Sequence, residues 1–236
     1  MNQNLYNTGD ILIRCPQEHL ENIYNGCRDV DYNLDLHVAM YINNYYCITV
    51  QEKVVYIPIE EFAQGSPVIV MRYQGNSDDA KKAADWALEC YRSQQVSYDL
   101  KEPVISGKSP YEVQSTAYCS LLPLWAYLQT SEIPLIPEDK IIDIRKADYL
   151  RFAKKFLASK EARTMMKIRS AKNSTPDTWE KIARWTHPLL AILPISFLDS
   201  PYLAMVGVDL AQTSGDNKNS EQGANYVESF AGICIK

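Results

Sequence analysis

Short apolar runs in the first part of the chain predict an antiparallel β-sheet. Each run is rich in β-branched and aromatic residues and is bounded by a polar turn, which is typical of strands. The Asn43-Asn44 pair tolerates positive φ and predicts a two-residue hairpin turn. Polar residues 51–53 predict the next turn. The predicted strands cover residues 11–14, 37–42, 45–50, 54–57 and 67–73.

Apolar residues three and four positions apart predict helices between and after these strands. Ser115 and Thr116 are good capping residues, and Pro123 is tolerated only where a helix has no backbone donor to lose. A buried helix is therefore expected to begin at Cys119 or Ser120. The predicted helical segments of this part of the chain cover residues 17–25, 58–62, 78–94 and about 120–130.

The C-terminal part differs in pattern from the sheet region. Helical periodicity covers residues 146–158 and 174–185, and a strand-like segment covers 202–210. Residues 212–225 are rich in Gly, Ser, Asn and Asp, which is typical of disorder. We expect an α+β fold, with five or six antiparallel strands packed against helices. Its parts would be a domain over 1–140, a basic, mainly helical extension over 141–211, and a flexible tail with a short terminal element over 212–236.

Composition indicates a protein that needs neither disulfides nor structural zinc. With 236 residues and 46% apolar content, the chain can bury a full core. Its six cysteines are far apart, with no C-x-x-C pair, so we expect free thiols, a reducing compartment, and neither a metal nor a cofactor. Residues 1–7 lack the features of a signal peptide, which favours a cytoplasmic location. Secretion as an effector by a signal-independent route stays an alternative.

The net charge of −5 hides a strong asymmetry. Twelve basic residues against four acidic ones give residues 145–184 a charge of +8, which leaves −13 for the rest. Such a segment either contacts an anionic surface, such as a membrane, or is a solvated helix face, which is the commoner case. Membrane contact would use Lys154, Lys155 and Arg163. Nucleic acid is not expected as a partner, because no aromatic-interleaved basic stripe is present.

Cys119 is the candidate nucleophile. A thiol at the first turn of a helix lies at the positive end of the macrodipole, which favours the thiolate and predicts a lowered pKa. The alternative is an inert buried cysteine, which is common in chains with several cysteines. A nucleophilic cysteine also needs a base, and the chain has three histidines. His19 and His187 are expected at the surface, whereas His37 opens a buried strand and can point toward a helix terminus packed there.

Six sequence pieces, in this order and spacing, resemble the circularly permuted papain-fold enzymes of the YiiX/YebB-like group. These enzymes are relatives of the NlpC-type cell-wall amidases. The resemblance covers roughly residues 8–130. The pieces are Gly9-Asp10-Ile11-Leu12, His37-Val38-Ala39-Met40-Tyr41-Ile42, Pro58-Ile59-Glu60-Glu61-Phe62, Arg72, Tyr98-Asp99 and Tyr118-Cys119-Ser120.

The resemblance implies a papain-like permuted fold and a cysteine hydrolase of the amidase or peptidase type. Cys119 would attack a carbonyl to give a thioester, with His37 as its base and backbone N–H groups at the helix start holding the oxyanion. The orienter of His37 in this family lies on the next strand, where the alignment places Thr49. Strand alternation puts Gln51 on the same face, so Thr49 or Gln51 is the expected partner.

Three functions stay open. The first is hydrolysis of an amide in a peptide or protein. The second is cleavage or transfer of a lipid ester through an acyl-cysteine at an anionic membrane, as in relatives of lecithin:retinol acyltransferase. The third is an inactive binding module, which is favoured by Leu121 and Thr49 at positions where similar proteins usually carry acidic or polar residues.

Overall fold

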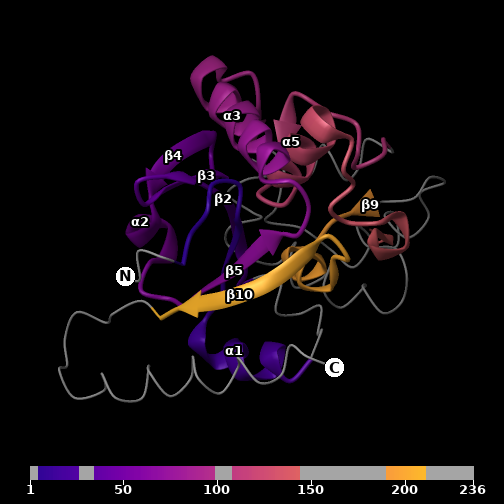
Figure 1. Ribbon diagram of the computed structural model, residues 1–236. Helices are drawn as coiled ribbons and strands as arrows, with labels where there is room; N and C mark the ends of the chain where they lie inside the picture. Colours follow the sequence, from indigo (N-terminus) through magenta and orange to yellow (C-terminus); the bar gives the residue numbers. More distant parts are fainter. Residues whose placement is uncertain (1–4, 27–34, 99–107, 144–189, 211–236) are drawn as a thin grey trace, which may run out of the picture.

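The computed structural model describes residues 5–26, 35–98, 108–143 and 190–210 (Figure 1). The helices of this part are α1 (Gln17–Tyr24), α2 (Ile59–Ala63), α3 (Ser77–Ser93) and α5 (Leu121–Ser131), with the short turns η2 (Glu138–Lys140) and η4 (Pro194–Asp199). The strands are β1 (Ile11–Arg14), β2 (His37–Asn43), β3 (Tyr46–Val50), β4 (Val54–Pro58), β5 (Val68–Tyr73), β6 (Ser97–Tyr98), β7 (Thr116–Ala117), β8 (Ile142–Asp143), β9 (Leu190–Ala191) and β10 (Leu203–Asp209).

Six of these strands form one sheet in the order β10-β5-β1-β2-β3-β4. Every neighbouring pair is antiparallel. β1 lies at the centre, where Ile11 faces Met40 on β2 and Met71 on β5. The predicted α+β class and antiparallel sheet are therefore confirmed, while the papain-like permutation remains a prediction.

The hairpin between β2 and β3 turns one residue later than the sequence pattern predicts. Asn44 and Tyr45 adopt the left-handed conformation, with φ of 45° and 64°. Asn43 instead ends β2 and pairs with Tyr46. The reason is a register shift between Tyr41 and Asn43, which extends β2 before the chain can turn.

Part of the expected C-terminal extension belongs to the sheet itself. β10 pairs with β5 along its length, with an irregularity between Met205 and Gly207 (Figure 1). The chain therefore returns to the sheet after β8 and β9, which pair with each other. The six-stranded sheet thus includes residues on both sides of the expected boundary at 140. The helices predicted over 146–158 and 174–185, and the tail over 212–236, lie outside the described residues.

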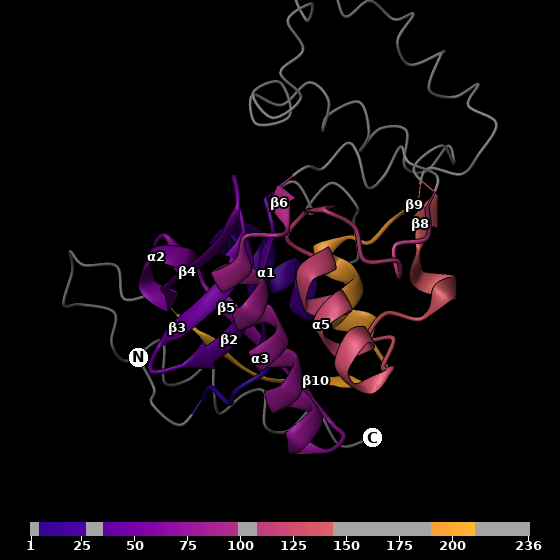
Figure 2. The same cartoon turned by 90° about the horizontal axis from the view of Figure 1, so that it is seen from above.

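Strand alternation gives the sheet two different buried faces. One face carries Ile11, Ile13, Val38 and Met40 and packs against α3 and α5. These two helices lie side by side over the sheet (Figure 2). The other face carries Leu12, Ala39, Tyr41 and Val70 and packs against α2, whose Phe62 is fully buried. The described part of the chain is therefore layered, with the sheet between helices.

The small side chains of α3 allow it to lie close to the sheet. Ala80, Ala83, Ala84 and Ala87 are buried along one side of the helix. Asn76 caps it by accepting a 3.0 Å hydrogen bond from the Asp78 backbone N–H. Gly9 lies beneath the helix with φ of +88°, and a Cβ there would lie 2.6 Å from the Ala80 oxygen.

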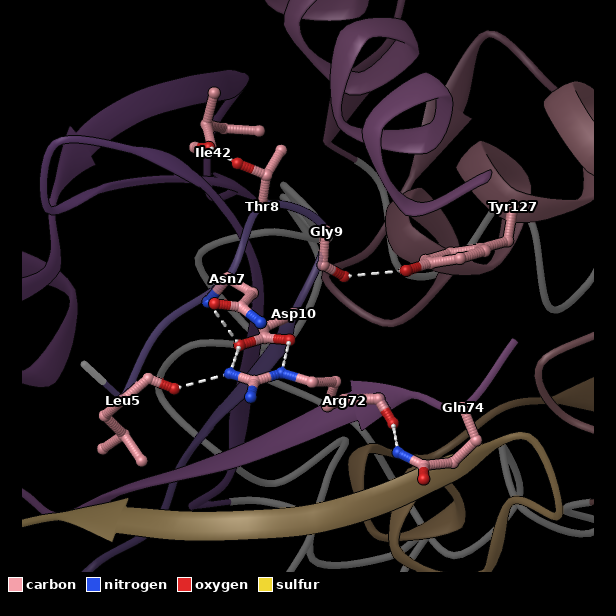
Figure 3. Close-up of polar contacts among 9 residues, drawn as sticks. All are labelled: Leu5, Asn7, Thr8, Gly9, Asp10, Ile42, Arg72, Gln74 and Tyr127. Carbon is pink, nitrogen blue, oxygen red and sulfur yellow. Dashed lines mark hydrogen bonds and ion pairs between the residues drawn. The ribbon is translucent and has the colours of Figure 1, made fainter. Parts of the chain in front are cut away.

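The corner at the start of β1 joins the N-terminal segment, the sheet and α5 (Figure 3). Asp10, only 2% exposed, accepts two hydrogen bonds from Arg72 on β5, at 3.0 and 2.8 Å. The same guanidinium donates to the Leu5 carbonyl at 2.7 Å. The Tyr127 hydroxyl of α5 donates to the Gly9 carbonyl at 3.0 Å. This set of contacts fixes α5 relative to β1 and β5.

We predict that Gly9→Ala lowers the free energy of unfolding by about 2–4 kcal/mol, because the new methyl adds a backbone clash to left-handed strain. Gly65→Ala is the matched control, since Gly65 also has positive φ but a Cβ added there would have nothing within 4 Å. The control should lose only about 1 kcal/mol. Urea denaturation of both variants measures the difference. Equal losses would contradict the packing of Gly9 against α3.

Candidate active site

Cys119 lies in the turn that leads into α5. The first helical residue is Leu121, one to two residues after the predicted start. Cys119 is partly exposed, whereas Cys15, Cys47 and Cys90 are buried. Within the described ranges it is therefore the cysteine that a reagent or substrate reaches most readily.

Burial raises the pKa of the Cys119 thiol above its ordinary value. The Val38 backbone N–H, the Ser120 hydroxyl and N–H, and the charge of Arg14 each lower this pKa without offsetting the burial. The predicted lowering by the helix macrodipole is therefore wrong. A helix terminus contributes about 0.3–1 kcal/mol, which is less than the desolvation of a buried thiolate costs. The thiol is protonated at neutral pH.

Ser120 holds a hydrogen-bond donor beside the sulfur. Its side chain is fully buried, and its hydroxyl oxygen has no hydrogen-bond partner among the described residues. A buried hydroxyl without a hydrogen-bond partner lowers the stability of the folded state by about 1–3 kcal/mol. The hydroxyl lowers the pKa of Cys119, which identifies the thiolate as the species it stabilises. The next backbone N–H, that of Leu121, is already bonded to the Tyr118 carbonyl at 3.0 Å and is not free for an oxyanion.

The Thr49 hydroxyl determines the tautomer of His37. Thr49 Oγ1 lies 2.6 Å from the Val38 carbonyl oxygen, to which only the hydroxyl proton can be donated. The same oxygen lies 3.0 Å from His37 Nε2. Because the single hydroxyl proton is used at Val38, Oγ1 must accept at His37. His37 therefore carries its proton on Nε2 and leaves the Nδ1 lone pair free.

His37 is held as a neutral imidazole. Burial lowers its pKa to about 3, and the charge of Arg14 acts in the same direction. The ring lies against Phe62 of α2, with the ring centroids 5.8 Å apart. A neutral imidazole with a free nitrogen is the form required of a general base.

Of the two candidate orienters, the structure brings only Thr49 to His37. Gln51 lies exposed in the bend after β3, and its backbone N–H donates to the Lys53 carbonyl at 3.0 Å. No hydrogen bond joins the Gln51 side chain to His37, although both residues are described. The difference follows from the strand ends: Thr49 is still inside β3, whereas Gln51 is past its last residue, Val50.

Cys119 and His37 converge on the peptide of Val38. The registered pairs of β2 and β3 end at Met40 and Ile48, so Val38 has no partner residue on β3. Its carbonyl accepts a hydrogen bond from the Thr49 hydroxyl, and its backbone N–H is one of the groups that lower the pKa of Cys119. The structure shows no hydrogen bond between this sulfur and the His37 ring, two groups that are both described. The thiol and the imidazole thus both favour their neutral forms, and no preformed ion pair joins them.

Arg14 is a site residue that the sequence reasoning missed. It is the last residue of β1 and pairs in register with His37. Its positive charge acts on both Cys119 and His37. The signal available in the sequence was a cation closing an otherwise apolar strand, Ile11-Leu12-Ile13-Arg14.

Of the other histidines, the structure describes His19. It is partly buried and contacts the exposed Asp35 at 3.1 Å. Within the described ranges, no group of three or more His, Cys, Asp or Glu side chains could hold a metal ion. None of the helices described there is long and apolar enough to cross a membrane. His187, Lys154, Lys155 and Arg163 lie outside the described residues.

Comparison with known proteins supports the fold but not an activity. No protein-family model matches the chain, and no curated protein matches it. A solved structure, the metalloprotein YiiX from Escherichia coli O157:H7, is similar with a TM-score of 0.51 and 17% identity. The match covers 87% of this chain and 98% of that one. At this identity the likeness shows a shared YiiX-like fold, in agreement with the resemblance of residues 8–130.

The raised pKa predicts how Cys119 reacts with iodoacetamide. Only the thiolate is alkylated, so the rate should keep rising with pH beyond the ordinary thiol range, near 8.5. Peptide mass spectrometry over a pH series, with circular dichroism as a folding control, measures the rate at Cys119. A rate that is already constant below pH 7 would indicate a preformed thiolate and contradict the neutral pair.

Proposed function

We propose that the protein is a cysteine-dependent hydrolase of the amidase or peptidase type. Cys119 is the nucleophile, His37 the general base and Thr49 the residue that positions the base. The observation that carries the proposal is the set of hydrogen bonds around Val38. They leave Nδ1 of His37 unprotonated next to the Val38 N–H, which lowers the pKa of Cys119.

The proposed reaction begins with both groups neutral. The Cys119 thiol gives its proton to His37 Nδ1 as the sulfur attacks the carbonyl carbon of the substrate. The resulting imidazolium then protonates the leaving amine, and a thioester forms. A water molecule that gives its proton to His37 then attacks the thioester, and His37 returns that proton to the departing Cys119 sulfur as the carboxylic acid product is released.

The surroundings of the sulfur support this order of events. Charge separation in a buried site is costly before the substrate is bound. The Ser120 hydroxyl, the Val38 N–H and the charge of Arg14 all favour the thiolate once it forms. Because these groups are in place before the reaction, no reorganisation is needed when the charge develops.

A second candidate function is that of an inactive binding module. It is favoured by the raised pKa of Cys119 and by the missing hydrogen bond between its sulfur and the described His37 ring. The lipid-ester alternative depends on the basic segment at 145–184, which lies outside the described residues. It therefore stays a prediction from the sequence.

Acylation by p-nitrophenyl acetate distinguishes the enzyme from the binding module. We expect the intact mass of the protein to rise by one acetyl group on Cys119, and the group to be lost on further incubation. Cys119→Ala should abolish this acylation, and His37→Gln should slow it about 100-fold. Acylation of Cys119 at equal rates with and without His37, or no acylation at all, would support the binding module instead.

Thr49 is tested by a pair of substitutions. Thr49→Val keeps the shape but removes the acceptor at His37 Nε2, so we expect about 10- to 100-fold slower acylation. Thr49→Ser keeps the hydroxyl and should retain the rate within a few fold. If Val and Ser variants that fold equally well react alike, the hydroxyl has no role in positioning His37.

A further inference from the structure

Arg14 lies on the same face of the sheet as His37 and next to it. The two residues are register partners at the end of β1 and the start of β2. Both also meet Phe62 of α2: the His37 ring packs against its ring, and Arg14 Nη1 donates to its carbonyl at 3.4 Å. The guanidinium is therefore part of the wall that surrounds the candidate base.

The described residues use little of the hydrogen-bonding capacity of Arg14. A guanidinium has five N–H donors, and the one bond to Phe62 is long for a hydrogen bond. No carboxylate of the described residues lies within ion-pair distance of it. Arg72 provides the contrast, since it makes two bonds to Asp10 and one to the Leu5 carbonyl. Arg72 is thus structurally satisfied, whereas Arg14 is a partly buried cation for which the described residues provide no counter-ion.

Retaining such a cation has a cost. Burial lowers the pKa of Arg14, which means that the charged form is poorly solvated there. Arg14 could be replaced by an apolar residue if its role were only to pack against Phe62. A partly buried guanidinium with free donors is instead suited to bind an anion that enters from outside.

We propose that Arg14 binds a carboxylate of the substrate beside the reacting carbonyl. The preferred substrates are then amides in which a residue next to the scissile bond carries a free carboxylate. A carboxylate fits the planar fork of Arg14 through two parallel N–H···O bonds. This assignment rests on the proposed function for the identity of Cys119 as the reacting group.

Two reagents of nearly the same shape test the proposal. Iodoacetate and iodoacetamide both alkylate a thiolate, with carbon–sulfur bond formation and loss of iodide, but only iodoacetate carries a carboxylate. The ratio of their rates at Cys119 cancels any change in the pKa of the thiol. We expect Arg14→Gln to lower the iodoacetate-to-iodoacetamide ratio at least tenfold. Arg14→Lys should give an intermediate ratio, because it keeps the charge but loses the fork.

Arg92→Gln is the matched control, because Arg92 is exposed in the last turn of α3, and its ratio should equal that of the wild type. The wild-type protein provides a second test that does not depend on a variant folding. Its iodoacetate rate should saturate and be slowed by acetate but not by acetamide. A rate that is linear in iodoacetate and insensitive to acetate overturns the proposal, as does an unchanged ratio in a folded Arg14→Gln protein.

The outcome is separable from that of the proposed function. Failure of p-nitrophenyl acetate to acylate Cys119 would reject the hydrolase, because that ester is neutral and does not require Arg14. An Arg14-dependent iodoacetate ratio in the same protein would still establish an anion site beside Cys119. If p-nitrophenyl acetate acylates Cys119 but the iodoacetate ratio does not depend on Arg14, the hydrolase is supported and its preference for carboxylates is rejected.

Discussion

The ion pair between the buried Asp10 and the partly exposed Arg72 is the interaction on which the arrangement of this protein depends. It joins β1 to β5 and, through the Leu5 carbonyl, holds the N-terminal segment on the sheet. The carbonyl of the preceding residue, Gly9, accepts a hydrogen bond from the Tyr127 hydroxyl of α5. Loss of Arg72 costs about 3–5 kcal/mol, because the Asp10 carboxylate that remains is buried without its partner. Since Cys119 leads directly into α5, the same corner fixes where the sulfur lies.

At the other end of β1, burial governs the chemistry. It raises the pKa of Cys119 and lowers that of His37, so the two groups favour their neutral forms. A neutral His37 can accept the proton of the Cys119 thiol only at a ring nitrogen that carries no proton. Thr49 provides this condition by using its one proton at the Val38 carbonyl. In the proposed site the histidine is therefore oriented by a hydroxyl, which fixes the tautomer without adding charge to a buried site.

Much of the fold follows from the sequence because alternation and helical periodicity are local signals. The five N-terminal strands and the position of Cys119 before a buried helix follow from such patterns. The choice of Thr49 or Gln51 came instead from the family resemblance, to which strand alternation added only the shared face. The pairing of β10 with β5 does not, because β10 is far from β5 in the sequence and no local signal names its partner. The hairpin turn was misplaced by one residue, since the register shift near Tyr41 depends on pairing rather than composition.

The electrostatics of the site were the least predictable feature. A helix start suggested a lowered pKa for Cys119, but desolvation depends on how completely other elements cover the sulfur. Arg14 was overlooked because one cation at the end of an apolar strand is common. Arg14 can be recognised as a neighbour of His37 only once the pairing of β1 with β2 is known, because this pairing places both side chains on one face of the sheet.

The protonation of His37 is the most direct test of this account, and it is measured by nitrogen-15 NMR of the imidazole rings between pH 4 and 8. Assignment with His37→Gln separates its signals from those of the other two histidines. Because burial and Thr49 act together on His37, we expect a neutral ring protonated on Nε2 throughout this range. A ring protonated on Nδ1, or one that titrates near pH 6.5, would contradict it.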